Sequence, residues 1–354
     1  MQEGIATQAF PAASVAITHH GQLIARKAFG RFTYEADAPK VSEDTLFDLA
    51  SLTKVVATTT MAAMLYERGL LELEAPVAGV VPEFAAQPGD DPRRRAVTFH
   101  LLLAHSSGLP AHEKFFLKAR TREELLQAAF VTPLTADPGT RMEYSDIGFM
   151  VLGVALERLA GEALDGFCKR EIFAPLGLWH TGFNPPAELR GQIPPTANER
   201  VGFEGRVEKR NVQGEVQDEN AYALGGVAPH AGLFAPAEDL ARFAHAMLRG
   251  GSPILRPETV ERFTRRELSP PGTSRALGWD TPSAPSLSGK YFGPRSFGHL
   301  GYTGTSLWMD PDRELSVTLL TNRTFPEARV ESVNRAIRQV SAQFHDAVIE
   351  AIEK

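Results

Sequence analysis

Cysteine is nearly absent from this sequence, because Cys168 is the only one among 354 residues. A single thiol can form neither an internal disulfide nor a cysteine-based metal cluster. Cys168 lies in a segment, Leu164–Ile172, that we predict to be helical, and we interpret it as a packed small hydrophobic side chain and not a nucleophile. His19 and His20 stand in a predicted turn without a third ligand, and no His-Glu-x-x-His spacing occurs. The sequence therefore predicts a reaction without metal or cofactor.

Long apolar runs and basic runs are missing as well. No stretch approaches the roughly 18 apolar residues that cross a membrane, and a net charge of −6 without a basic cluster argues against nucleic-acid binding. Met1-Gln2-Glu3-Gly4 lacks the basic and then apolar pattern of a secretory leader. We expect the chain as written to be cytoplasmic, and periplasmic or secreted if a leader has been trimmed. A small molecule is the expected partner, and the oligomeric state stays open.

The pattern at both ends of the chain predicts sheet. Ala13–Thr18 and Gln22–Phe29 read as a hairpin with glycine in its turn, and Thr305–Met309 and Leu315–Thr321 read as another. From Val330 to Ile352 apolar residues recur at steps of three and four, which predicts an amphipathic helix over one sheet face. The two ends should therefore meet in one sheet.

The middle of the chain has a mainly helical pattern, and 354 residues exceed one ordinary core. We predict an α/β lobe from residues 1–72 and 266–354, with an antiparallel sheet flanked by helices, and a second, all-α lobe from 73–265. Pockets form preferentially at such borders, so the active site should lie between the lobes. Two polar stretches, Pro185–Leu224 and Ser269–Ser296, are expected to be loops lining this cleft. The clearest helical segments are Thr98–Ala104, Arg122–Phe130, Ser145–Leu159 and Pro236–Leu248.

Ser51 and Lys54 form the first chemical motif. Three residues apart at the start of a helix predicted to reach Arg68, they share one helical face, so the ammonium can reach the hydroxyl. A neighbouring base turns a serine into a nucleophile, and a desolvated lysine can be part of that base. The backbone N–H groups at a helix start favour an oxyanion. The alternative is that Ser51 caps the helix and Lys54 points into water.

Two further motifs complete a pattern. Ser51-x-x-Lys54, Tyr144-Ser145-Asp146 and His299-Leu300-Gly301 together resemble the three active-site motifs of the serine β-lactamase and penicillin-binding protein superfamily. The class C-like branch and the related family VIII carboxylesterases are the most similar. The likeness runs from about Phe10 to about Thr321, and it implies a β-lactamase/transpeptidase-like fold.

The resemblance also implies a role for each residue. Ser51 would be acylated, Lys54 would ease deprotonation because a nearby cation favours an anion, and Tyr144 would be the general base. The backbone N–H groups of Ser51 and Tyr302, the latter on an edge strand, would form the oxyanion hole. Gly301 would let a substrate carbonyl approach the backbone closely.

Two positions depart from the usual motifs, namely Asp146 where asparagine is common and His299 where lysine is common. An ionised Asp146 beside Lys54 should pair with the lysine and repel substrate carboxylates. His299, mostly neutral near pH 7, lacks the charge that attracts them. Both departures weaken the expectation of an efficient β-lactamase and leave the acylation machinery in place. We interpret His105 and His230 as hydrogen-bonded structural residues.

The sequence thus predicts a serine hydrolase that acts through an acyl-enzyme on carboxylic esters or related acyl compounds, with weak β-lactam hydrolysis. One alternative is a β-lactamase or a D-amino-acid-specific peptidase acting on amides. Another alternative is a non-catalytic relative that has the same fold and only binds a ligand. No Gly-x-Ser-x-Gly elbow occurs, which disfavours an α/β-hydrolase triad.

Overall fold

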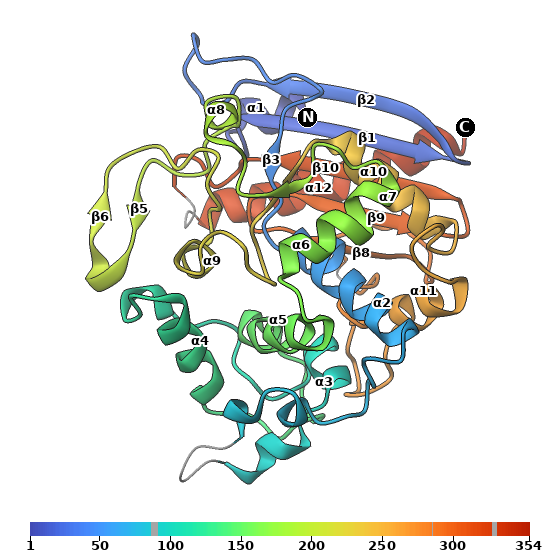
Figure 1. The fold of residues 1–354 in the computed structure, drawn as a ribbon. Coiled ribbons are helices and arrows are strands. Elements are labelled where there is room, and N and C mark those ends of the chain that lie inside the picture. The colour runs from blue at the N-terminus through green and yellow to red at the C-terminus, as the bar shows by residue number, and fades with distance from the viewer. Residues whose placement is uncertain (86–90, 285, 328–330) are drawn as a thin grey trace.

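Strands from both ends of the chain meet in one antiparallel five-stranded sheet, in the order β2–β1–β10–β9–β8 (Figure 1). The computed structural model describes residues 1–85, 91–284, 286–327 and 331–354. Both predicted hairpins are present, with boundaries within two residues of those expected. The strands are β1 (Ala12–His19), β2 (Gln22–Gly30), β3 (Phe47–Asp48), β4 (Gly182–Phe183), β5 (Arg200–Val201), β6 (Val207–Glu208), β7 (Leu233–Ala235), β8 (Phe297–Leu300), β9 (Ser306–Asp310) and β10 (Leu315–Thr321).

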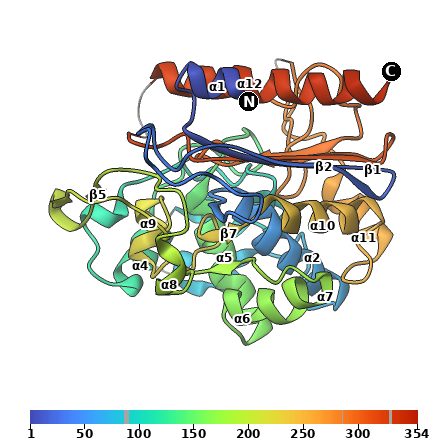
Figure 2. The ribbon, with the colours of Figure 1, turned by 90° about the horizontal axis from the view of Figure 1, so that it is seen from above.

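Helices cover both faces of this sheet. Helix α12 and the short α1 lie on one face, and α10 and α2 lie on the other (Figure 2). The helices are α1 (Gln2–Ala6), α2 (Thr60–Glu67), α3 (Phe99–Leu103), α4 (Arg122–Val131), α5 (Asp146–Ala160), α6 (Leu164–Cys168), α7 (Ala174–Leu176), α8 (Ala187–Arg190), α9 (Glu219–Ala223), α10 (Ala237–Leu248), α11 (Pro257–Thr264) and α12 (Glu331–Ile352).

The side-chain alternation of the central strands explains this layering. Successive residues of a strand point to opposite faces, so Val15 packs with Ile337 of α12 while the next residue, Ala16, joins the core on the other face. All of β10 is buried, as expected of a strand covered on both faces. The amphipathic C-terminal helix is confirmed from Glu331 onward; Val330 lies outside the described residues.

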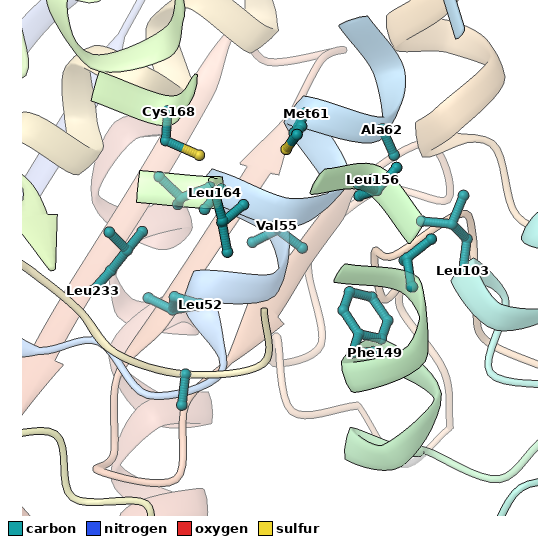
Figure 3. Close-up of a cluster of buried hydrophobic side chains, with 14 of the residues drawn as sticks. Leu52, Val55, Met61, Ala62, Leu103, Phe149, Leu156, Leu164, Cys168 and Leu233 are labelled. Atoms are coloured by element: carbon teal, nitrogen blue, oxygen red, sulfur yellow. The ribbon is translucent and has the colours of Figure 1, made fainter. Parts of the chain in front are cut away.

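The larger core lies beneath the sheet and holds the helix that carries the first motif (Figure 3). Val55 and Met61 of that helix pack with Phe149 and Leu156 of α5, each of them fully buried. Each such side chain contributes about 1.5–3 kcal/mol when removed from water. Cys168 is buried in the same cluster, which confirms its interpretation as a packed residue.

Some elements differ from the sequence prediction. The segment 73–265 is not only helical, because β7 pairs with β3 and β4 to form a separate three-stranded sheet. The Pro185–Leu224 stretch contains α8, α9 and the small β5–β6 hairpin in addition to loops. Helix α10 packs against β1 and β10 of the large sheet. The division into two lobes stays a prediction, and none of the described helices has the length and apolarity needed to cross a membrane.

We predict that Gly153→Ala destabilises the protein. A Cβ atom at Gly153, in α5, would lie 2.5 Å from the Cβ and Cγ atoms of Pro229, whose carbonyl is held by the Thr58 hydroxyl at 2.6 Å. Overpacking of this kind costs about 1–3 kcal/mol. The measurement is the melting temperature, with Gly79→Ala as the control because nothing lies within 4 Å of a Cβ there. Equal melting temperatures for the two variants would contradict the prediction.

Candidate active site

Ser51 follows a tight turn at the end of β3. Ala50 adopts a left-handed backbone conformation with φ of +46°, and the helix begins directly after Ser51. Residues Lys54–Thr59 form a π-helical turn before α2, a feature frequent at functional sites. The predicted helix is present, and Lys54 Nζ lies 3.0 Å from Ser51 Oγ. The alternative in which Lys54 points into water is wrong.

The Lys54 ammonium is fully buried and surrounded by acceptors. Besides Ser51 Oγ it contacts Asp146 Oδ1 at 2.6 Å and donates to the carbonyl of His230 at 3.1 Å. Burial lowers the pKa of Lys54, but Asp146 and Tyr144 outweigh that effect and leave it above its ordinary value. Lys54 is therefore a cation at neutral pH, and the predicted Asp146–Lys54 pair is confirmed.

The ring of Tyr144 lies beside the Lys54–Asp146 pair, with its centroid 4.8 Å from Lys54 Nζ. The Arg275 guanidinium lies 5.1 Å from the same ring. Burial raises the pKa of Tyr144, Lys54 opposes the rise, and the net result is above the ordinary value. Within the described part of the chain the hydroxyl has no well-aligned hydrogen bond, although Lys54 and Ser51 are close enough to lower its pKa. The resting side chain is thus a neutral phenol.

The second motif is held at the start of α5. Ser145 caps the helix by accepting from the N–H of Gly148 at 3.0 Å, and its own N–H donates to Nδ1 of His105 at 3.0 Å. The His105 ring also packs 4.5 Å from that of Tyr144. These contacts confirm that His105 is a hydrogen-bonded residue, and they place Asp146 in the first turn of α5, beside Lys54.

The third motif ends strand β8. A Cβ at Gly301 would lie 2.0 Å from Thr305 Oγ1 and 2.5 Å from the carbonyl oxygen of Leu49, so only glycine allows this close approach to the Ser51 turn. Tyr302 lies in the loop after β8 and not on the edge strand as predicted. Burial and Arg275 hold the pKa of His299 well below its ordinary value, so this histidine is neutral, as the sequence predicts.

Two cavities open on either side of Ser51, and Tyr144 and Tyr302 line both. The first, of about 370 Å³, is basic, and the second, of about 420 Å³, is mainly acidic. Their charged linings come partly from the Ser269–Ser296 and Pro185–Leu224 stretches, as predicted. The basic cavity has Arg275, Arg323, Arg338 and Asp280, and the acidic one has Asp146, Asp218, Glu219, His112 and Lys114.

Sequence reasoning missed several of these residues. Three arginines line the same cavity as His299, although the replacement of lysine at this position predicted a loss of positive charge there. His112 faces Asp146 with 3.8 Å between Nδ1 and Oδ2, and its contact with that carboxylate raises the pKa of His112. Asp218 binds Nε2 of His230 at 3.1 Å. The only available signal was the polar character of the loop stretches, which predicts a cleft but not which residues face it.

One group of side chains has the composition of a metal site. His112, Asp146 and Asp218 each offer a ligand atom, and these atoms lie within 4.8 Å of one another. Both carboxylates already have a partner, Lys54 for Asp146 and His230 for Asp218. We assign no metal to this group, and the metal-free reaction stays a prediction.

Known proteins share this architecture along the whole chain. The Beta-lactamase family profile matches residues 1–342. An N-acetylmuramyl-L-alanine amidase of Bacillus subtilis (strain 168) is 34% identical over 346 residues, covering 89% of this chain and 77% of its own. A putative D-alanyl-D-alanine carboxypeptidase of Escherichia coli (strain K12) is 32% identical over 345 residues, covering 89% and 79%.

A solved structure agrees in fold. EstCE1, described as a hydrolase with promiscuous acyltransferase activity, superposes with a TM-score of 0.76 at 23% identity and covers 96% of each chain. The chain belongs to the β-lactamase family. It is a hydrolase of the serine β-lactamase and penicillin-binding protein superfamily, and the resemblance seen in the motifs is confirmed.

We predict that Asp146→Asn lowers the pKa of both Lys54 and Tyr144, because the carboxylate raises both. Removing one neighbouring charge at this distance shifts a pKa by about one unit or more. NMR titration of isotope-labelled lysine and tyrosine measures the two values. Asp165→Asn, on an exposed part of α6, is the control and should change neither. An unchanged Lys54 pKa in Asp146→Asn would contradict the ion pair.

Proposed function

We propose that the protein cleaves acyl compounds through an acyl-enzyme on Ser51. The observation that carries this proposal is the contact between Ser51 Oγ and the buried Lys54 ammonium, beside the Tyr144 phenol, at the junction of two cavities. Mere ligand binding does not require a nucleophile, a buried cation and a phenol in contact. The non-catalytic alternative is therefore the weaker reading.

In this mechanism the minor phenolate form of Tyr144, whose own proton has passed to solvent, takes the proton of Ser51 Oγ as that oxygen attacks the substrate carbonyl. Lys54 favours the phenolate form of Tyr144, while burial and Asp146 oppose it. The backbone N–H groups of Ser51 and Tyr302 would stabilise the oxyanion. Tyr144 then protonates the leaving group, the acyl bond to it breaks, and water activated by Tyr144 hydrolyses the ester on Ser51. Because the pKa of Tyr144 is raised, the rate should increase from neutral toward alkaline pH.

The substrate is proposed to carry a carboxylate beyond the scissile bond. Arg323 is 5% exposed and lines the basic cavity with Arg275 and Arg338, and guanidinium groups bind carboxylates well. The names of two relatives, an N-acetylmuramyl-L-alanine amidase and a putative D-alanyl-D-alanine carboxypeptidase, add N-acetylmuramyl-L-alanine amides and D-alanyl-D-alanine peptides to the esters expected from the sequence. We favour amide or ester substrates of this anionic kind over simple neutral esters.

The first experiment is labelling with a fluorophosphonate probe, read by mass spectrometry. We expect labelling at Ser51 that is abolished in Ser51→Ala and falls by about 10²-fold or more in Lys54→Met. Ser306→Ala is a suitable control, since Ser306 is a buried hydroxyl bonded to His345 at 3.2 Å. Folded wild-type protein that stays unlabelled would favour the binding module.

Steady-state rates then rank the substrates. We expect an N-acetylmuramyl peptide amide or a D-alanyl peptide to be cleaved with a higher kcat/KM than p-nitrophenyl butyrate, and nitrocefin to be poor. A strong preference for nitrocefin would place the protein among β-lactamases instead.

Arg338→Gln should raise KM for carboxylate substrates and leave neutral esters unaffected. Arg338 lies on the exposed side of α12 and lines the basic cavity, so its loss removes attraction without disturbing the core. An increase in KM of about 10–100-fold corresponds to one lost charged hydrogen bond. Arg335→Gln, on the same helix but outside the cavity lining, should match the wild type. Equal effects of both variants on KM would exclude a carboxylate site here.

A further inference from the structure

Asp48 is a buried carboxylate three residues before Ser51. It ends strand β3 and is 2% exposed. One oxygen, Oδ1, accepts from the N–H of Ala50 at 2.8 Å, and the other, Oδ2, accepts from the N–H of Gln217 at 2.6 Å. Asp48 does not line either cavity beside Ser51. It is therefore placed to act through other residues and not on substrate.

The first of these bonds supports a strained turn. Ala50 has a φ of +46°, a region that residues with a Cβ atom adopt at a cost. The Asp48 carboxylate accepts the Ala50 N–H in that conformation, and the next residue is Ser51. Any relaxation of Ala50 would move Ser51 Oγ relative to Lys54.

The second bond connects Asp48 with Gln217, which lines the acidic cavity. Gln217 precedes Asp218, whose carboxylate binds Nε2 of His230 at 3.1 Å. The carbonyl of His230 accepts from Lys54 Nζ at 3.1 Å. Hydrogen bonds and neighbouring residues thus connect Asp48, the Gln217–Asp218 loop, His230, Lys54 and Ser51 in a closed ring.

The backbone of the same segment is tied to the third motif. Thr303 Oγ1 donates to the carbonyl of Asp48 at 2.8 Å, and Thr305 Oγ1 donates to that of Leu49 at 3.0 Å. Tyr302 adjoins Thr303 in this loop. The segment around Asp48 therefore contacts both the loop after β8, which contains Tyr302, and the Gln217–Asp218 loop.

We propose that Asp48 is a positioning residue that locks the Ser51 turn to the Gln217–Asp218 loop and so sets the distance between Ser51 Oγ and the Lys54 ammonium. This inference rests on the proposed function, because the distance matters only if Ser51 is the nucleophile.

The electrostatics of Asp48 agree with such a role. Burial raises its pKa to about 6 from an ordinary 3.8; Asp218 adds to the rise, while the N–H groups of Ala50 and Gln217, and Arg200, oppose it. The folded chain holds this proton more tightly than the unfolded chain, so the contribution of Asp48 to stability falls as the pH rises from about 4 to about 6. An ionised Asp48 thus costs stability at neutral pH, which is not the sign expected of a residue kept for stability alone.

The test compares Asp48→Asn with Asp239→Asn. Asp239, in α10, is also buried, and it accepts from the N–H of His180 at 3.0 Å and from Thr181 Oγ1 at 2.9 Å. Asparagine keeps one acceptor oxygen and loses the other. We expect Asp48→Asn to lower kcat and the rate of fluorophosphonate labelling by about tenfold or more with little change in KM, since misplacing a reacting atom by an ångström costs that much. Asp239→Asn should stay within about twofold of the wild type.

A second variant tests the cause. Glycine adopts the left-handed region freely, so Ala50→Gly added to Asp48→Asn should restore part of the lost rate. Hydrogen exchange gives a readout independent of activity: peptides covering 47–53 and 214–220 should exchange faster together in Asp48→Asn and not in Asp239→Asn.

The possible outcomes are distinct. Normal kcat in folded Asp48→Asn, or an equal loss in Asp239→Asn, overturns the positioning role, as does unchanged exchange in 214–220. If the wild type is not labelled at Ser51, the proposed function fails. The exchange data then still decide whether Asp48 ties the two segments together.

Discussion

The buried ammonium of Lys54 is the constraint on which the rest of the site depends. An uncompensated charge inside a protein is very costly, so a buried lysine persists only where acceptors surround it. Here they come from the start of α5, the loop at His230 and Ser51 itself. The helix, the loop and the turn must therefore be in place together, and the architecture that buries Lys54 also assembles the site.

Asp146 changes the protonation equilibria of Lys54 and Tyr144. A carboxylate beside Lys54 keeps the lysine protonated and raises the pKa of Tyr144 as well. Under the proposed mechanism Lys54 is an electrostatic neighbour and not the base itself, and proton transfer falls to Tyr144. The charge of Asp146 is neutralised by Lys54 and lies on the acidic-cavity side, while arginines line the opposite cavity. We therefore expect any repulsion of substrate carboxylates by Asp146 only on the acidic-cavity side of Ser51.

The spacing of apolar residues along the sequence was sufficient to predict the long helices and strands. The hairpins at both ends, the amphipathic C-terminal helix and the helices at Ser145 and Pro236 have repeats that any packed face requires. The two-residue strands β3 and β4 have no such repeat, and β7 is only three residues long. Their pairing, which brings Asp48 beside Phe234, follows from the packing of segments far apart in the chain.

The sequence by itself determined the family, the order of the elements and the three motifs, because these depend on local residue patterns and short spacings. Only the tertiary structure decided that His112 faces Asp146, that arginines from two distant segments and α12 line the same cavity as His299, and that Asp48 connects Ser51 with Gln217. Contacts of this kind join residues separated by many turns of chain. Their energies depend on burial and distance, and no local pattern in a single sequence encodes either.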